Sequence, residues 1–373
     1  MNLLMLSGDS SVAQGQEGAF SFMLSHFSRY WQRIDILTPR APGAQARVLY
    51  GNVYIHPSPY SRALQSWYVV RQGRRLLAER PYGLVVSHDF ATYYNGWGAL
   101  WLMRRRSEPL VSEVYHVEGF PITSPREALW NVMARLYLPL MGRRMTAMRV
   151  SGAPSVLAIL KALGVPEAKF LELPSVYLDL RAYRPMPEIA KTYDALFVGR
   201  LASNKGLPLL LKAWLRLVRT HPRAVLALRG DGPLAGWLSR FVARHGLAEN
   251  VVRVPRQHIA AMPALYNAAR SLICASTVEG NPRVTLEAMA CGVPIISTRV
   301  GIMPLVIEHG VNGWLVDRDP DHLADILRAL LDDEVLAAQV GRQGQIAAQA
   351  YEAERTIARY AQAYQDLAQK TRA

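Results

Sequence analysis

The chain has 373 residues, half of them hydrophobic, and this is enough for two globular domains that each bury a core. A membrane-spanning helix is excluded because the longest apolar stretch, LPLLLKAWLRLV, is interrupted by Lys212 and Arg216 before it reaches about 18 residues. The formal net charge of +14 is more than a nucleotide ligand alone would balance, so an anionic partner or surface is expected.

Short apolar runs alternate with helical segments along the chain, which is typical of parallel βαβ units in an α/β fold. The opening MNLLMLSGDSS fits a first buried strand better than a signal peptide, so we expect a cytoplasmic protein. Pro185 and Pro187 interrupt the pattern and predict a domain boundary. Nine runs are expected to be strands: LLML, IDIL, LVVS, LVSEV, ALFVG, AVLAL, VVRV, SLICA and PIIST.

Basic residues are concentrated in the first half of the chain. Residues 1–185 hold 21 Lys and Arg against 12 Asp and Glu, hence 21 − 12 = +9. Many of them alternate with aromatic residues, as in Trp67 to Arg75 and Trp97 to Arg106, which suits an anionic membrane surface. Ordinary amphipathic helices with solvated arginines explain the pattern equally well. Nucleic acid is not expected as a partner because no helix-turn-helix, zinc-finger or RNP pattern occurs.

Two glycine-bearing loops follow predicted strands in the second half. ALFVG runs into Gly199 to Gly206, where Arg200 and Lys205 could neutralise a diphosphate leaving group. AVLAL is followed by the turn Arg229-Gly230-Asp231-Gly232-Pro233. Such loops are common in proteins, so taken alone they are more often structural than functional.

The segment EGNPRVTLEAMACGVP, residues 279–294, places Glu279 before a helix start and Glu287 inside the helix. Asn281 is predicted to be the N-cap and Pro282 the first helical residue, with the helix ending at Cys291-Gly292. A helix start suits a phosphate group, and nearby carboxylates suit the hydroxyls of a sugar. The segment therefore predicts a site for a sugar nucleotide.

This segment resembles the Glu-x7-Glu signature of retaining glycosyltransferases of family 4, and the resemblance continues through Glu287-Ala288-Met289-Ala290 and Gly292-Val293-Pro294. It implies the GT-B fold, in which two doubly wound Rossmann-like domains with parallel sheets face a cleft. Residues 1–185 would bind the acceptor and residues 186–351 the nucleotide-sugar donor. Residues 352–373 would form a final helix that crosses back to the first domain.

The resemblance also implies roles for individual residues. Arg200 and Lys205 match the diphosphate-binding loop, Glu279 would contact the transferred sugar, and Glu287 would hold the ribose hydroxyls. The run Val254-Pro255-Arg256 falls where relatives hold the nucleobase, and Gly15 belongs to a glycine-bearing first loop. The implied donor-binding residues are Gly15, Gly230, Val254, Pro255, Asn281, Pro282, Arg283, Val284, Thr285 and Glu287.

His116, after the strand LVSEV, resembles the strand-end histidine of the family and is the expected catalytic histidine on the acceptor side. His88 is the second candidate for this role. Each of the two could instead be a histidine bonded to a loop carbonyl. No cofactor or metal is expected. Asp317-Arg318-Asp319 is interpreted as a helix start with Asp319 as N-cap, and Cys274 and Cys291 as reduced, packed thiols.

The implied reaction moves a hexose-type sugar from a nucleoside-diphosphate sugar to a hydroxyl of a glycan or lipid-linked acceptor, with retention of configuration, in glycan, glycolipid or cell-envelope polysaccharide synthesis. Two alternatives stay open. One is a catalytically silent scaffold for a partner transferase, and the other is a nucleotide-sugar epimerase.

Overall fold

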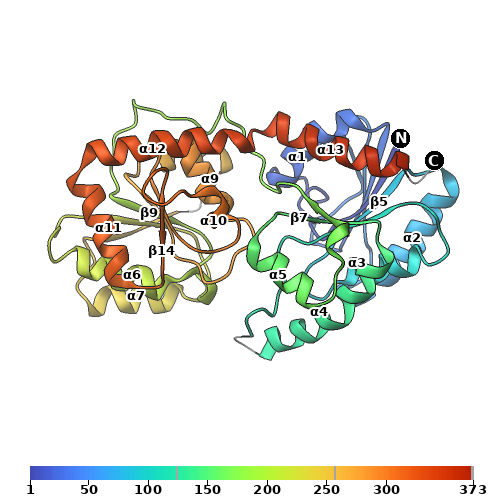
Figure 1. Ribbon diagram of the computed structural model, residues 1–373, viewed down its shortest axis with the longest axis horizontal. Helices are drawn as coiled ribbons and strands as arrows, with labels where there is room; N and C mark the ends of the chain where they lie inside the picture. Colours follow the sequence, from blue (N-terminus) through green and yellow to red (C-terminus); the bar gives the residue numbers. More distant parts are fainter. Residues whose placement is uncertain (123–124, 256–257, 371–373) are drawn as a thin grey trace. The chain divides into compact units, whose positions relative to one another are not determined.

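The computed structural model describes residues 1–122, 125–255 and 258–370. The chain forms two compact units (Figure 1), and each is considered by itself. The N-terminal unit contains residues 1–177 and the segment that begins at Ala353, and the C-terminal unit is Leu178–Glu352. The division thus falls at Tyr177, upstream of the two prolines at which the sequence predicts it.

The N-terminal unit is built on an eight-stranded sheet with the order β3-β4-β2-β1-β5-β6-β7-β8. All of its pairings are parallel except that of β3 with β4. In the central strand β1, residues Leu3 to Leu6 are apolar and buried, as LLML predicts. The strands are β1 Asn2–Leu6, β2 Arg33–Thr38, β3 Arg47–Leu49, β4 Val53–Pro57, β5 Leu84–His88, β6 Leu110–Glu113, β7 Ala147–Val150 and β8 Phe170–Glu172.

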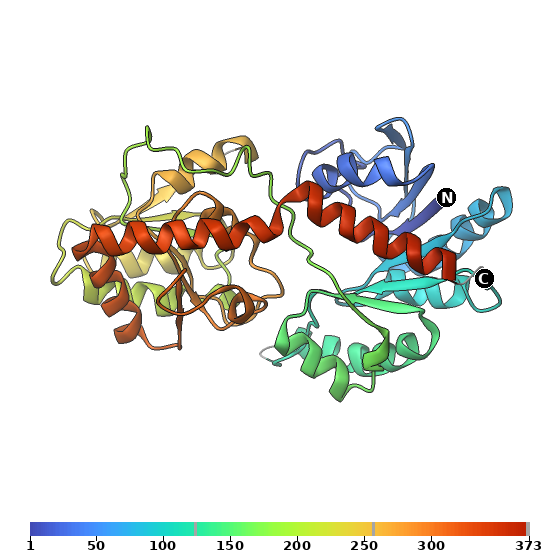
Figure 2. The same cartoon turned by 45° about the horizontal axis from the view of Figure 1, so that its top comes forward.

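Among its described residues this unit has six α-helices: α1 Ala19–Phe27, α2 Gln65–Glu79, α3 Tyr94–Leu102, α4 Pro125–Arg144, α5 Pro154–Ala162 and α13 Ala353–Lys370. The last of them, α13, packs beside α1, as Figure 2 shows in red and blue. Its apolar side, with Ile357, Tyr360 and Tyr364, joins the core formed by Leu3 and Ile36. The expected return of the final helix to the first domain is therefore present.

A buried carboxylate, Glu113 at the end of β6, is held under α13. Arg149 Nη1 lies 3.0 Å from its Oε1, and Tyr360 and Tyr364 donate hydrogen bonds to the same oxygen at 2.7 and 2.5 Å. Tyr115 donates to Oε2 at 2.6 Å. Burial opposes ionisation, but the arginine and the hydroxyl donors outweigh it and lower the pKa of Glu113 to about 2. The carboxylate thus joins α13 to two strands.

This carboxylate makes the stability of the unit depend on pH. Its folded pKa of about 2 lies below the ordinary value of 4.5, so its stabilisation is present above pH 4.5 and is lost as the pH falls toward 2. The full loss amounts to about 3 kcal/mol. We expect urea unfolding of Glu113→Gln to vary less with pH over this range than that of the wild type. Glu354→Gln, at an exposed ion pair with Arg29, should keep the wild-type slope; equal slopes in all three proteins would contradict the assignment.

The C-terminal unit has a six-stranded, fully parallel sheet with the order β11-β10-β9-β12-β13-β14. Its strands are β9 Ala195–Val198, β10 Leu226–Arg229, β11 Val251–Val254, β12 Leu272–Cys274, β13 Ile295–Thr298 and β14 Trp314–Val316. Its α-helices are α6 Leu207–Leu217, α7 Ala235–Arg244, α8 Met262–Asn267, α9 Arg283–Ala290, α10 Met303–Val306, α11 Pro320–Asp332 and α12 Glu334–Ala348.

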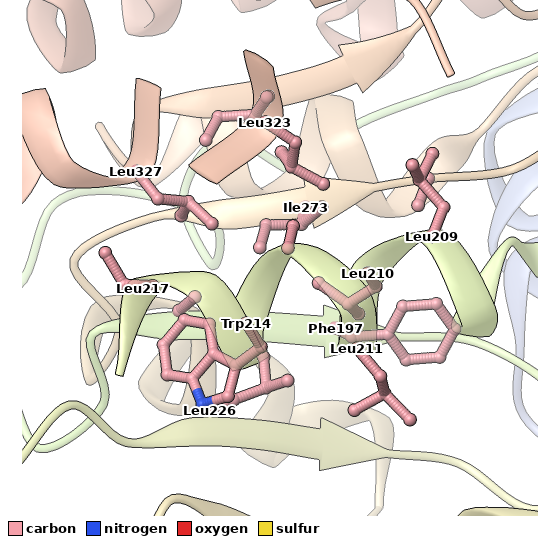
Figure 3. Close-up of a cluster of buried hydrophobic side chains, with 14 of the residues drawn as sticks. Phe197, Leu209, Leu210, Leu211, Trp214, Leu217, Leu226, Ile273, Leu323 and Leu327 are labelled. Carbon is pink, nitrogen blue, oxygen red and sulfur yellow. The ribbon is translucent and has the colours of Figure 1, made fainter. Parts of the chain in front are cut away.

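The core of this unit is centred on α6, the helix whose apolar sequence is interrupted by Lys212 and Arg216. Figure 3 shows side chains of α6 meeting Phe197 of β9, Ile273 of β12 and Leu323 of α11. Trp214 is fully buried, and its indole nitrogen donates to the carbonyl oxygen of Asn250 at 3.0 Å. Because α6 buries its apolar side in this way, the loop that precedes it is fixed at one end.

Both cysteines are free and buried, as expected. Within the described part of the chain, none of the helices has both the length and the apolarity that a bilayer crossing requires.

Candidate active site

In the C-terminal sheet the strand order changes direction between β9 and β12, so the connections that follow these two neighbouring strands run in opposite directions. Ligands of doubly wound sheets bind at such a switch point. The loop after β9 passes very close to the loop after β12. Gly206 has φ +67°, and a Cβ atom there would lie 1.8 Å from the carbonyl oxygen of Ala275. Thr277 N also donates to Asn204 O at 2.8 Å. Glycine is required at 206 both by its backbone conformation and by this approach.

Two predicted residues, Lys205 and Glu279, meet at this point although 74 positions separate them. The ammonium group of Lys205, on a 3₁₀ turn after β9, contacts Oε1 of Glu279. Ser276 Oγ donates to the same oxygen at 2.8 Å. Both ionic side chains stay partly exposed, at 22% and 15%, so solvent or a ligand can reach them. Ser276 was missed in the sequence because a serine after a strand carries no distinctive signal.

The turn that contains Gly230 supports the loop of Arg200. Gly230 has φ +148°, and a Cβ atom there would lie 1.8 Å from the carbonyl oxygen of Gly199. Leu201 N donates to Asp231 O at 2.9 Å, which holds the two loops together. Arg200 lies between these contacts with an exposed side chain. The structure therefore brings Gly230 and Arg200 to the same edge of the sheet.

Val254, the last residue of β11, pairs in register with Arg229 and so lies beside the Gly230 turn. The preceding residue, Arg253, donates from Nη2 to Gly230 O at 2.8 Å. Pro255 follows with an exposed ring, and Arg256 lies outside the described residues.

The start of α9 differs from the prediction by one residue. The helix begins at Arg283 with Pro282 as its N-cap, so Asn281 is not the cap and Pro282 is not the first helical residue. The reason is the backbone of Pro282, whose ψ of 85° is not helical even though its φ of −70° would allow a helix. The predicted end at Cys291-Gly292 is confirmed, with Gly292 at φ +72°.

Thr285 lies in the first turn of α9 and faces inward. Its hydroxyl donates to Pro282 O at 2.5 Å, and its backbone N–H bonds the same oxygen at 3.1 Å. Both donors of Thr285 are therefore used inside the protein. The remaining predicted positions of this turn, Arg283 and Val284, precede it.

Glu287 is inside α9, as predicted, and its carboxylate is 7% exposed. Arg283 Nε lies 2.6 Å from Oε1, and Tyr266 donates to Oε2 at 2.7 Å. Burial and the neighbouring carboxylate keep the pKa of Tyr266 well above its ordinary value, so the phenol remains a donor. The pairing with Arg283 follows helical i,i+4 spacing and could be found in the sequence, whereas Tyr266 could not.

In the N-terminal unit the strand order reverses between β1 and β5. A Cβ atom on Gly8, after β1, would lie 2.2 Å from the Phe90 ring, after β5. Further along the first loop, Gly15 has φ +73°, a conformation that suits glycine, and it faces the guanidinium of Arg47 on the edge strand β3. The structure therefore places Gly15 on the loop after β1 but beside β3, and not beside the loop after β5.

The two candidate histidines of this unit have different surroundings. His88 Nε2 lies 3.2 Å from Glu113 Oε2, so this ring belongs to the buried cluster under α13. The neighbour that the structure places beside His88 is therefore a carboxylate. His116 lies on the loop after β6 and is half-buried.

Asp319 is the N-cap of α11, as predicted, and accepts a hydrogen bond from Asp321 N at 2.9 Å. Over the ranges that the structure describes, no three His, Cys, Asp or Glu side chains are grouped so that they could hold a metal ion.

Two doubly wound units with loops converging at the switch point define the GT-B fold, which confirms the predicted fold class. Two solved structures share it over 98% of this chain: sucrose-phosphate synthase from Thermosynechococcus elongatus (TM-score 0.82, 19% identity, 98% of that chain) and HepE from Anabaena in complex with UDP and glucose (TM-score 0.78, 18% identity, 100% of that chain).

Sequence comparison matches the C-terminal unit to a family. The model of glycosyl transferases group 1 matches residues 182–347. D-inositol 3-phosphate glycosyltransferase of Pseudarthrobacter chlorophenolicus is 35% identical over 163 residues, 42% of this chain and 39% of that protein. N-acetyl-alpha-D-glucosaminyl L-malate synthase of Bacillus anthracis is 30% identical over 203 residues, 51% of this chain and 52% of that protein. The matched part thus spans about half of these relatives or less.

Proposed function

We propose that this protein is a retaining, metal-independent glycosyltransferase of family 4. It moves a hexose-type sugar from a nucleoside-diphosphate sugar to a hydroxyl of a glycan or lipid-linked acceptor. The observation that carries the proposal is the contact of Lys205 with Glu279 at the switch point, next to the start of α9. The match of residues 182–347 to glycosyl transferases group 1 supports it.

The chemical demand of this reaction is the charge that develops on the departing diphosphate. Lys205 and the exposed Arg200 supply positive charge. The backbone N–H groups of Arg283 and Val284, in the first turn of α9, supply hydrogen-bond donors at the positive end of a helix. When the diphosphate is bound, Lys205 exchanges its contact with Glu279 for a phosphate oxygen. Glu279 is then available to accept a hydrogen bond from a hydroxyl of the sugar.

Glu287 has a different part, that of holding the ribose. Its carboxylate is fixed by Arg283 and Tyr266 and does not need to move when a ligand binds. As the bond to the diphosphate breaks, the anomeric carbon gains oxocarbenium character, and the acceptor oxygen attacks from the same face, so configuration is retained. On the acceptor side, His116 and the loop of Gly15 would contact the incoming hydroxyl compound.

We also propose a cytoplasmic location and a role in glycan, glycolipid or cell-envelope polysaccharide synthesis. The two free, buried cysteines support a reducing compartment.

Nucleotide binding provides the first test. At a concentration about 100 times Kd, UDP or the nucleoside diphosphate that fits is expected to raise Tm by roughly 5–10 °C. Glu287→Gln should lose most of this shift because its neutral amide accepts hydrogen bonds from ribose less strongly. The shift is measured for uridine, guanosine and adenosine diphosphates and their sugar conjugates.

Glu249→Gln, an exposed glutamate of the same unit, serves as control and should keep the full shift. The proposal fails if no nucleotide stabilises the wild type. Conversion of the donor in the absence of any acceptor would instead identify an epimerase.

A further inference from the structure

Three helices, α2, α3 and α4, cover the same side of the N-terminal sheet. α2 connects β4 to β5, α3 connects β5 to β6, and α4 connects β6 to β7. All three connections run in the same direction across the sheet, and right-handed crossovers place such helices on one side. α3 contacts α2 on one flank and α4 on the other. The outward sides of these helices therefore form one continuous surface of the unit; Figure 1 labels the three helices.

Helix α4 is apolar on both sides. Its inward side, with Ala134, Tyr137, Leu138 and Met141, is fully buried. Its outward side carries four large apolar residues at spacings of three and four, and we call them the α4 stripe: Leu129, Val132, Leu136 and Leu140, which are 57, 53, 58 and 46% exposed. A helix that faced only water would have polar residues there.

A groove between α2 and α3 adds aromatic surface. It has a volume of about 630 Å³ and is lined by Trp67, Trp97 and Trp101 together with Arg74. Trp101 is 72% exposed and Trp67 is 49% exposed. We call it the tryptophan groove. Indole rings of this kind are favoured where an apolar environment meets water, because one edge is a hydrogen-bond donor.

Charge on the same surface has one sign. Residues 62–80, 94–109 and 125–144 hold twelve arginines and three glutamates, which is 12 − 3 = +9 of the +14 of the whole chain. Glu79 pairs with Arg75 and Arg80, and Glu108 pairs with Arg106. The other nine arginines there are all exposed: Arg62, Arg71, Arg74, Arg104, Arg105, Arg126, Arg135, Arg143 and Arg144.

We propose that this surface, made of the α4 stripe, the tryptophan groove and the surrounding arginines, docks on an anionic lipid bilayer. The apolar stripe enters the boundary between headgroups and acyl chains, while the arginines contact lipid phosphates. A fluid bilayer adapts to three helices at once and supplies the negative charge that these arginines require. The proposal goes beyond the transferase activity, since it concerns another surface and needs no donor.

The structure also divides the aromatic residues of the basic and aromatic sequence pattern into buried and exposed ones. Tyr68 is buried, so it belongs to the core. Trp67 and Trp101 point outward beside the arginines, so they serve the surface. The α4 stripe favours a membrane surface over solvated amphipathic helices, because solvated arginines alone do not explain four exposed aliphatic residues.

Vesicle flotation of the full chain tests the proposal. The protein should float with vesicles of equimolar phosphatidylcholine and phosphatidylglycerol, and should stay in solution with phosphatidylcholine alone or at high salt. Arg104→Gln with Arg105→Gln should weaken binding about 30-fold, from about 1 kcal/mol for each arginine. Leu136→Ser with Leu140→Ser should also weaken it at least about tenfold.

Matched variants of the C-terminal unit control for general changes of charge and hydrophobicity. Arg240→Gln with Arg244→Gln and Val335→Ser with Ile346→Ser alter exposed residues of the same kinds and should float like the wild type. All variants should keep the nucleotide-induced Tm shift, so that failure of docking is separated from failure of the donor site.

Three results would overturn the proposal. The first is equal flotation with neutral and anionic vesicles, and the second is wild-type flotation of both surface variants. The third is a dimer in light scattering that dissociates in Leu136→Ser with Leu140→Ser, because the α4 stripe would then bind a second copy of the chain.

Discussion

Lys205→Ala is expected to lower kcat for sugar transfer by about 10²–10³-fold, the usual cost of removing one charge-stabilising group from an active site. Lys205 has two tasks in the proposed reaction. It neutralises Glu279 in the free protein and the diphosphate when the sugar departs. Only the second task belongs to the transition state, so the loss should fall mainly on kcat, with a smaller change in KM.

The measurement is initial-rate transfer with the donor found by the thermal-shift screen. Lys212→Ala, at an exposed position of α6, is the control and should retain full activity. The double variant Lys205→Ala, Glu279→Ala separates the two tasks. If it is no slower than Glu279→Ala alone, Lys205 acts only by holding Glu279, and the leaving-group role is wrong.

Arg149→Met should destabilise the N-terminal unit by about 3–5 kcal/mol, because it leaves the buried carboxylate of Glu113 without its cation. Arg149 is 1% exposed and also stacks over the Tyr360 ring at 3.6 Å, so the variant loosens α13 as well. The measurement is the free energy of unfolding in urea at neutral pH.

Arg29→Met is the matched control, since Arg29 pairs with Glu354 of α13 in an ion pair whose side chains are 62 and 65% exposed. It should cost less than about 1 kcal/mol. Similar losses in the two variants would mean that burial does not set the strength of the Glu113 cluster.

The nine strands expected from apolar runs are all present, because a buried parallel strand leaves a continuous hydrophobic run in the sequence. Five strands of the described residues were missed: β3, β4, β7, β8 and β14. β7 contains the buried Arg149, which interrupts its apolar run, and β8 and β14 have only three residues each. For β3 and β4 the reason lies at the sheet edge. β3 is a three-residue antiparallel edge strand whose middle residue, Val48, is 57% exposed, so it lacks a buried run. β4 includes His56 and Pro57, which are atypical of strands.

The candidate site was predictable where a motif is local and not where it depends on tertiary contacts. Glu287 and Arg283 are one helical turn apart, so their ion pair can be expected from spacing. The contact of Lys205 with Glu279 requires the strand order at the switch point, which no local pattern contains. Tyr266 reaches Glu287 from a separate helix, and a buried tyrosine is more often a core residue.

The N-terminal unit is discontinuous in sequence, since α13 follows the entire C-terminal unit along the chain. During synthesis, residues 1–177 therefore emerge from the ribosome without the helix that supplies two of the hydroxyl donors to Glu113. The C-terminal unit, in contrast, is one uninterrupted segment and can complete its core as soon as residue 352 has emerged. The usual order of cotranslational folding, in which the first domain is finished first, is thus reversed in this chain. Until α13 arrives, the apolar surface that it later covers is exposed to chaperones and proteases.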